Sequence, residues 1–209
     1  VGDTFTDARG EEIIKNLLEG KEVQLPRFNF ITGKKEWYDE PVQLGENQPV
    51  LVEGLHALNP KLTYFVPGYQ QMRIYLSALT QININNHNRI STSDTRLLRR
   101  MVRDVQYRGH SPEDTLSIWK SVRRGEEENI FSFQNRADRV FNSALIYELP
   151  VLKKMTRPML ERIKKGNPLY PEAQRLIHFF EPFRELSDDF VPDNSILREF
   201  IGYKKAKFP

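Results

Sequence analysis

Apolar residues recur at helical spacing in several stretches of the chain, and these stretches predict helices. They are residues 10–19, 91–108, a segment beginning at 111, and residues 150–165, 171–186 and 195–202. Gly20 and Gly109 are the expected stop signals of the first two. Ser91 or Ser93 is positioned to cap the second helix, and Ser111, followed by a proline in the first turn, to cap the third. The helical part of the fold is therefore distributed along the whole chain.

Short apolar runs between these helices predict strands. Residues 49–54 form an apolar run that ends in Glu53, which is typical of a buried parallel strand. Residues 72–79 and 137–142 predict a second core strand and a third strand. Residues 22–46, in which two aromatic-containing segments flank a glycine turn, predict a hairpin arm. Strands that alternate with helices favour an α/β fold.

The composition narrows the class of protein. Among 209 residues, 39% are hydrophobic and 28% charged, which is enough apolar surface for a real core. The absence of cysteine excludes disulfides, thiolate metal sites and cysteine nucleophiles, and it fits the cytoplasmic location that we expect. No apolar run approaches the ~20 residues of a membrane span. A net charge of +3 is too small to predict nucleic-acid binding from overall electrostatics.

Local charge is more informative than the total. Four arginines occupy one side of the helix predicted over 91–108, opposite its apolar side: Arg96, Arg99, Arg100 and Arg103. Like charges at this spacing repel by a few tenths of a kcal/mol per pair, so an anionic partner is one interpretation. Forked guanidiniums suit phosphate oxygens in particular. The alternative is a solvated face paired with Asp94, Asp104 and nearby glutamates.

Two further patterns suggest a site. A carboxylate at a strand end, as expected for Glu53, would hold Mg²⁺ while the metal bridges phosphates, or it would cap a helix or pair with an arginine. Phe28 and Phe30 alternate along one predicted strand, so both point to one face and would line a flat apolar ligand or simply join the core. The histidines have no metal-site spacing, and the phosphate-binding signature Gly-x-x-x-x-Gly-Lys-[Ser/Thr] is absent from these residues.

Several motifs together resemble the uridine kinase and phosphoribulokinase family of P-loop kinases. They are Leu25–Phe30, Val50–Leu55, Asp94–Gly109 and Ala137–Asp138. Residues 78–84, 121–131 and 194–202 are similar to one bacterial subgroup, in which a uridine-kinase-like domain follows a region resembling the TGS module of threonyl-tRNA synthetase. The resemblance implies a three-layer α/β/α P-loop NTPase fold with a mainly parallel sheet. The P-loop and the catalytic-base strand would precede Val1, so this chain would lack the N-terminal portion.

The resemblance also implies a nucleoside pocket. Phe28, Phe30 and Leu55 match its apolar lining, and Glu53 matches the glutamate near Mg²⁺ at the end of the Walker B strand. Asp114 stands near the position of the lid glutamine that reads the base. Similarly, Gly33 stands near the family's pyrimidine-reading histidine, so both base-reading groups of the family are replaced here.

The resemblance implies separate roles for the arginines. Arg96 matches the arginine that reaches the acceptor nucleoside, and Arg99, Arg103 and Arg108 lie in the lid, whose arginines stabilise the transferring phosphoryl group. We therefore expect residues 1–165 to be a partial kinase domain with its lid at 91–136, followed by a helical extension over 166–209.

The resulting hypothesis is ATP- and Mg²⁺-dependent phosphoryl transfer to a nucleoside by the intact protein, with this piece inert by itself because it lacks the P-loop. We expect a homo-oligomer with no membrane partner, and RNA as a partner through the upstream module. One alternative is a non-catalytic nucleotide- or RNA-binding protein on a kinase scaffold. Another is a structural fragment whose arginines are merely solvated.

Overall fold

The computed structural model describes residues 8–29, 32–54, 56–80, 83 and 89–203. The chain divides into two compact units. The first contains residues 1–75 and 122–141, and the second contains residues 76–121 and 142–209. Each unit has a hydrophobic cluster of its own, and the boundary at 165 between a partial kinase domain and a helical extension stays a prediction.

The first unit begins with a helix and a hairpin, as predicted. Helix α1 spans Ala8–Leu18, and strands β1 (Pro26–Asn29) and β2 (Lys34–Trp37) pair antiparallel. Gly33 adopts a φ of 68° next to the turn, a conformation that side chains other than glycine rarely adopt. The hairpin predicted from the aromatic segments and the glycine is therefore confirmed.

Helix α1 and the hairpin share a small hydrophobic cluster. Its buried members are Ile13, Leu17 and Val23, and its partly buried members are Leu25, Trp37 and Leu44. The cluster explains why a helix of only 11 residues is stable here, since short helices depend on burying an apolar face. Two 3₁₀ turns, Pro60–Leu62 and Gly68–Gln70, follow in the same unit.

The prediction of a buried strand over residues 49–54 is wrong. None of these residues is in a strand, and Leu51 is 88% exposed. A strand requires a hydrogen-bonded neighbour, and the two sheets among the described residues, β1–β2 and β3–β4, do not include this segment. An apolar sequence is therefore left without the pairing that would bury it.

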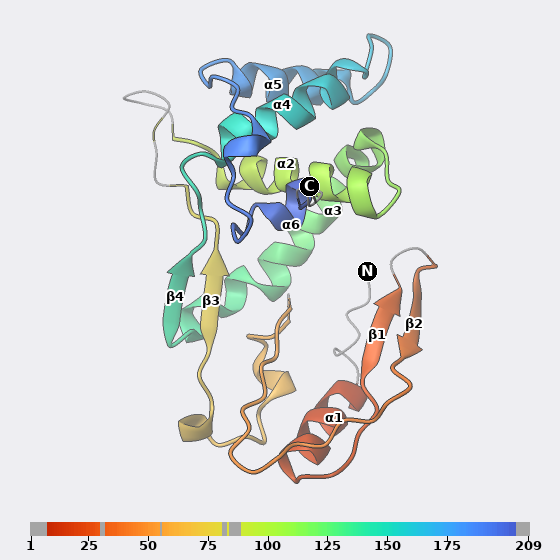
Figure 1. Cartoon of the computed structure of the whole chain (residues 1–209), viewed down its shortest axis with the longest axis vertical. Helices are drawn as coiled ribbons and strands as arrows, with labels where there is room; N and C mark the ends of the chain where they lie inside the picture. Colours follow the sequence, from red (N-terminus) through yellow and green to blue (C-terminus); the bar gives the residue numbers. More distant parts are fainter. Residues whose placement is uncertain (1–7, 30–31, 55, 81–82, 84–88, 204–209) are drawn as a thin grey trace, which may run out of the picture. The chain divides into compact units, whose positions relative to one another are not determined.

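Strands β3 (Ile74–Ser77) and β4 (Arg139–Asn142) form the second sheet. Both arrows point the same way in Figure 1, and Arg139 and Ser143 donate backbone hydrogen bonds to the carbonyls of Arg73 and Ser77 in the same order. The pair is therefore parallel. The predicted positions are confirmed, but the prediction of a core strand at 72–79 is only half right, because Tyr75 and Ala78 are buried while Ile74, Leu76 and Leu79 are exposed.

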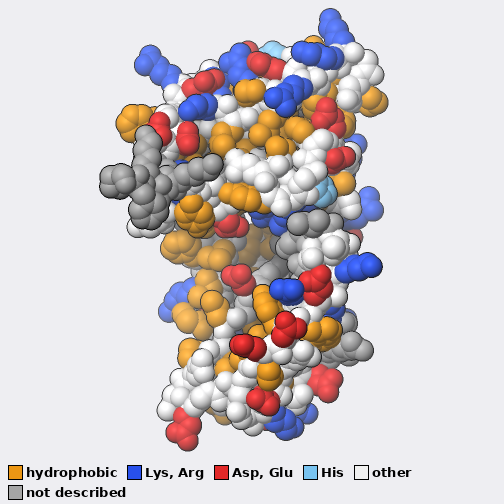
Figure 2. All heavy atoms as spheres, turned by 45° about the vertical axis from the view of Figure 1, so that its right-hand side comes forward, with side chains coloured by type: hydrophobic (Ala, Val, Ile, Leu, Met, Phe, Trp, Pro, Cys, Tyr) orange, Lys and Arg blue, Asp and Glu red, His pale blue; other side chains and the backbone are white. Residues whose placement is uncertain are grey.

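Much apolar surface of this two-stranded sheet is therefore in contact with solvent. The exposed hydrophobic side chains along it are Met72, Ile74, Leu76, Leu79, Val140 and Phe141. Figure 2 shows hydrophobic side chains at the surface, beside charged ones. Parallel sheets are normally covered on both faces, so these two strands are an incompletely covered piece of α/β architecture.

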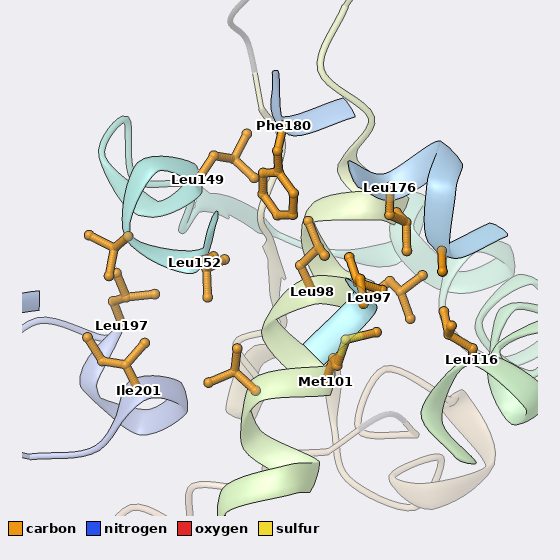
Figure 3. Packing of buried hydrophobic residues seen from close by; sticks show 14 of the residues in the cluster. Leu97, Leu98, Met101, Leu116, Leu149, Leu152, Leu176, Phe180, Leu197 and Ile201 are labelled. Atoms are coloured by element: carbon orange, nitrogen blue, oxygen red, sulfur yellow. The ribbon is translucent and has the colours of Figure 1, made fainter. Parts of the chain in front are cut away.

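The second unit is helical and contains the main core. Its helices are α2 (Thr92–Tyr107), the first part of α3 (Pro112–Asn129), α4 (Glu148–Glu161), α5 (Tyr170–Phe180) and α6 (Arg198–Ile201). Helix α4 packs against both α2 and α5, and α6 packs against α2. Figure 3 shows Leu97, Leu98 and Met101 of α2 among the buried side chains of the neighbouring helices. Short 3₁₀ segments, Phe131–Arg136 in the first unit and Asp188–Phe190 in the second, complete the elements.

The helix ends follow the signals in the sequence. The Ser91 hydroxyl accepts a hydrogen bond from the amide of Asp94 at 3.2 Å, so Ser91, not Ser93, caps α2. Gly109, with a φ of 66°, follows the end of that helix. Helix α5 ends at Phe180, earlier than the predicted 186, because Pro182 has no backbone N–H with which to continue the helical hydrogen bonding.

Candidate functional site

Most of the apolar side of α2 is buried, and its arginine side divides into two ionic groups. Leu97, Leu98, Met101 and Val102 have no exposed surface. On the opposite side, Arg99 is directed to a glutamate of α4, and three other arginines gather around one aspartate of α2. The predicted stripe is therefore neither a freely solvated face nor a uniform row of unpaired charges.

Arg99 forms a buried ion pair with Glu148. Its Nε donates to Oε2 of Glu148 at 2.5 Å, and its Nη2 donates to the carbonyl of Ser143 at 3.2 Å. The side chains are only 8% and 1% exposed. Burial raises the pKa of Glu148 above its ordinary value, while the neighbouring guanidinium acts in the opposite direction. The pair fixes Arg99 against α4, a contact that sequence analysis did not identify.

The second ionic group centres on Asp104, which is 1% exposed. Arg100 Nε lies 3.0 Å from Oδ2, and Arg108 Nη1 donates to Oδ1 at 3.2 Å. Arg103 Nε lies 3.6 Å from Oδ1. Three guanidiniums thus share one carboxylate, and the group has an excess of positive charge. Pairing with Asp104 was one of the two alternatives for the stripe, and the structure confirms that part of it.

Asp94, the other aspartate considered as a partner, pairs elsewhere. Arg175 of α5 contacts both of its carboxylate oxygens, at 2.9 and 2.7 Å, and also pairs with Glu172. These two carboxylates raise the pKa of Arg175 well above its ordinary value. Asp94 therefore fixes α2 to α5.

Phe200 of α6 also lies against the arginine side. Its ring centroid is 5.3 Å from the guanidinium carbon of Arg99 and 5.8 Å from that of Arg103. Cations at this distance from an aromatic face are attracted to it. Arg96, the fourth predicted site arginine, is half-buried on the same helix. The structure thus brings Arg99 and Arg103 together around one ring, and Arg103 and Arg108 together around Asp104.

Asp114 has a local structural role. At the start of α3 it accepts hydrogen bonds from the amide and hydroxyl of Ser111, at 2.8 and 2.7 Å, and its own amide donates to that hydroxyl at 3.0 Å. This is a reciprocal capping arrangement. The hydroxyl donor, followed by the amide, lowers the pKa of Asp114. Its position near the family's base-reading glutamine is therefore occupied by a helix cap.

The remaining candidates belong to the first unit or lie outside the described residues. Phe28 is in β1, where its backbone pairs with Lys35, and Phe30 and Leu55 are outside the described residues. Glu53 is exposed, and its predicted strand is absent. The described part of the chain contains no group of three or more acidic or histidine side chains that would hold a metal ion.

Sequence reasoning missed Glu148 and Phe200. Both are far from α2 along the chain, and neither has a motif of its own. The available signal was the number of arginines on α2, because a buried guanidinium requires a buried carboxylate. That signal indicates that a partner exists without identifying it.

Comparison with known proteins shows which family the sequence matches. The model of the phosphoribulokinase and uridine kinase family matches residues 7–146, which include the hairpin, α2 and α3. A uridine-cytidine kinase B of Dictyostelium discoideum is 28% identical over 138 residues, covering 65% of this chain and 49% of that protein. A uridine kinase of Staphylococcus aureus is 26% identical over 113 residues, covering 54% of this chain and 46% of that protein.

The chain thus spans about half the length of these curated relatives. Among the described helices, none combines the length and apolar character that crossing a membrane requires. The family's P-loop NTPase α/β fold is compatible with the helices and the small parallel sheet described above. With more than half of its residues matched, the chain belongs to the phosphoribulokinase and uridine kinase family.

Proposed function

We propose that this chain is part of a nucleoside kinase that transfers the γ-phosphoryl group of ATP to a sugar hydroxyl. The observation that supports this proposal most directly is the family match over residues 7–146, which includes the whole arginine helix. The names of two relatives, a uridine-cytidine kinase and a uridine kinase, favour a nucleoside as acceptor. The ATP-binding signature is absent from these 209 residues, so activity is assigned to the intact protein.

Within that reaction, the arginines of α2 would provide positive charge at the transferring group. Phosphoryl transfer needs mainly positioning and electrostatic stabilisation, which preorganised guanidiniums supply. Arg103 and Arg108 suit this role because they share the single carboxylate of Asp104 with Arg100. One negative charge among three guanidiniums leaves positive charge in excess. Arg99 would contribute from a fixed position, because Glu148 holds it. We assign Arg96 to the acceptor nucleoside.

The hairpin and Glu53 complete the proposed site. Phe28, Phe30 and Leu55 would line the nucleoside pocket, and Glu53 would provide one ligand to Mg²⁺, which when bound adds charge stabilisation at the phosphates. Because Asp114 is used as a helix cap and Gly33 replaces a histidine, base selection by the family's two groups is not expected. We therefore expect a broader or different acceptor than uridine.

The test is ATP consumption by the complete gene product across a panel of nucleosides. Turnover with at least one nucleoside supports the proposal, and no turnover with any nucleoside or phosphorylated sugar overturns it. In the active protein, Arg96→Ala is expected to lower kcat/KM for the nucleoside by about 10²-fold or more at saturating ATP. Arg157→Ala is a suitable control, because Arg157 lies on α4 in an exposed pair with Glu161.

A second candidate is a non-catalytic nucleotide- or RNA-binding protein on the same scaffold. The replacement of both base-reading groups favours it. The same assay separates the two: binding of a nucleotide or RNA without turnover of any acceptor supports this candidate and removes the kinase.

A further inference from the structure

We propose that Phe200, in the C-terminal segment, is a positioning residue that holds the guanidinium of Arg103 ready for a phosphate chain. The biological role of this contact rests on the proposed function, but the contact itself is tested by anion binding to this chain. It also gives a role to residues 188–202, which follow the part of the chain that the family model matches.

The first observation is that Phe200 is firmly held. Helix α6 packs against α2 (Figure 1), and Leu197 and Ile201 on either side of Phe200 are buried in the main core. Arg198 is 1% exposed and donates hydrogen bonds to backbone carbonyls of the same segment. The acceptors are Asp188 at 2.8 Å, Val191 at 2.5 Å, Gly202 at 3.2 Å and Pro192 at 3.4 Å. The segment is thereby folded around one buried cation.

The end of α6 is fixed as well. Gly202 has a φ of 87°, and a Cβ there would lie 3.0 Å from the hydroxyl of Tyr107 and 3.4 Å from Oε1 of Gln106. This turn therefore lies close to the last residues of α2. The Tyr147 hydroxyl and the Ser195 hydroxyl are also hydrogen-bonded, at 2.9 Å, which connects the segment to the start of α4. Phe200 has little freedom to leave the arginine side.

The second observation is the state of Arg103. Its side chain is 25% exposed, and its Nε is buried without a hydrogen-bond acceptor among the described residues. The nearest carboxylate, Asp104, is shared with Arg100 and Arg108. Burial, followed by the charge of Arg108, lowers the pKa of Arg103, and the negative charges of Asp104 and Glu199 oppose this shift only in part.

An aromatic ring stabilises such a cation in a particular way. A carboxylate would neutralise the guanidinium and occupy its N–H donors, whereas the face of a ring attracts the charge without accepting those hydrogen bonds. Phe200 can therefore keep Arg103 in place and leave its donors for an incoming anion. Planar guanidiniums bind phosphate oxygens through two parallel hydrogen bonds, so the fitting ligand is a phosphate chain.

The test uses inorganic tripolyphosphate as the probe and the 209-residue chain as the protein. Affinity is measured by calorimetry at low ionic strength for the unmodified chain and for Phe200→Leu, Phe200→Tyr and Tyr203→Ala. Leucine removes the ring, tyrosine retains it, and Tyr203 is 73% exposed, which makes it a nearby control. We expect Phe200→Leu to weaken binding about threefold to tenfold, and Phe200→Tyr and Tyr203→Ala to bind within twofold of the unmodified chain.

A general loss of structure is distinguished in two ways. First, the thermal unfolding midpoints of Phe200→Leu and Phe200→Tyr are compared. If the two midpoints are similar and only Phe200→Tyr retains tripolyphosphate affinity, the result supports a positioning role of the ring. In an Arg103→Ala background, Phe200→Leu is expected to have no further effect on tripolyphosphate binding, because the cation it holds is gone. Any of three results overturns the inference. The first is equal tripolyphosphate affinity of the unmodified chain and Phe200→Leu, and the second is a full additional loss of affinity from Phe200→Leu in the Arg103→Ala background. The third is that the unmodified chain does not bind tripolyphosphate.

These outcomes are separate from those of the kinase assay. If the complete gene product has no turnover but Phe200→Leu weakens tripolyphosphate binding, the proposed function fails and the positioning role stands. If the product is active and Phe200→Leu changes neither kcat nor tripolyphosphate affinity, the positioning role fails and the proposed function stands.

Discussion

At the scale of single residues, the environment of Arg99 differs sharply from that of a surface arginine. It is 6% exposed, and its charge is compensated by Glu148, which is 1% exposed. Two desolvated charges stabilise a protein only when both remain, since either one alone is buried without compensation. The pair therefore fixes the orientation of α2 relative to α4 more than it adds net stability.

Glu148→Gln is expected to reduce the free energy of unfolding by about 3 kcal/mol, because it leaves the Arg99 guanidinium buried beside a neutral side chain. Urea denaturation followed by circular dichroism measures the change. Glu161→Gln is the control, because Glu161 pairs with Arg157 at the surface and should cost less than about 1 kcal/mol. Equal effects of the two substitutions would contradict a special role of the buried pair.

Asp114 gives a prediction of pH dependence. Its folded-state pKa is lowered, first by the Ser111 hydroxyl, so the cap contributes stability above the unfolded-state pKa of about 4 and loses it as the pH falls through the folded-state pKa. Asp114→Asn should therefore lower the thermal unfolding midpoint at neutral pH. It should not lower it at an acidic pH where the Asp114 carboxyl is protonated in both the folded and the unfolded state. Glu113→Gln is the control in the same turn. An equal drop for Asp114→Asn at both pH values would refute the charged cap.

At the scale of elements, the exposure of the sheet β3–β4 is the least expected feature of the structure. Its strands have the sequence of buried α/β strands, but Leu76, Val140 and Phe141 are 65%, 61% and 60% exposed. Two strands alone cannot bury both of their faces and their edges. Exposed apolar strands of this kind favour self-association.

The double substitution Val140→Thr and Phe141→Thr is expected to reduce self-association and binding of a hydrophobic dye, with a change in stability within about 0.5 kcal/mol, as is usual for exposed positions. Threonine retains the strand preference. Light scattering and dye fluorescence at equal protein concentration measure the effect, with Tyr203→Thr as an exposed control outside the sheet. A large loss of stability would mean that the two side chains are buried in solution.

At the scale of the whole molecule, two hydrophobic clusters determine the organisation. The smaller one unites α1 with the hairpin, and the larger one unites α2, α4, α5 and α6. Each belongs to a different unit of the chain. Because the clusters have no member in common, local stability is expected to differ between them.

Leu98→Ala, in the larger cluster, is expected to cost about 2–5 kcal/mol in the stability of the helices around it. Leu17→Ala should instead accelerate hydrogen exchange in α1 and the hairpin while leaving α2 and α4 unchanged. Mass spectrometry of exchanged peptides resolves the two regions. Uniform acceleration by either substitution would show a single cooperative unit.

The sequence by itself determined the local features: the helices and their caps, the hairpin and the positions of strands β3 and β4. These features depend on spacing, capping residues and glycine, which act over a few residues. Tertiary structure alone decided that residues 49–54 form no strand, that Arg99 pairs with Glu148 and that Phe200 lies over Arg103. Those outcomes depend on which segments, distant in the chain, meet in space, because a strand needs a partner and a buried charge needs a counter-charge.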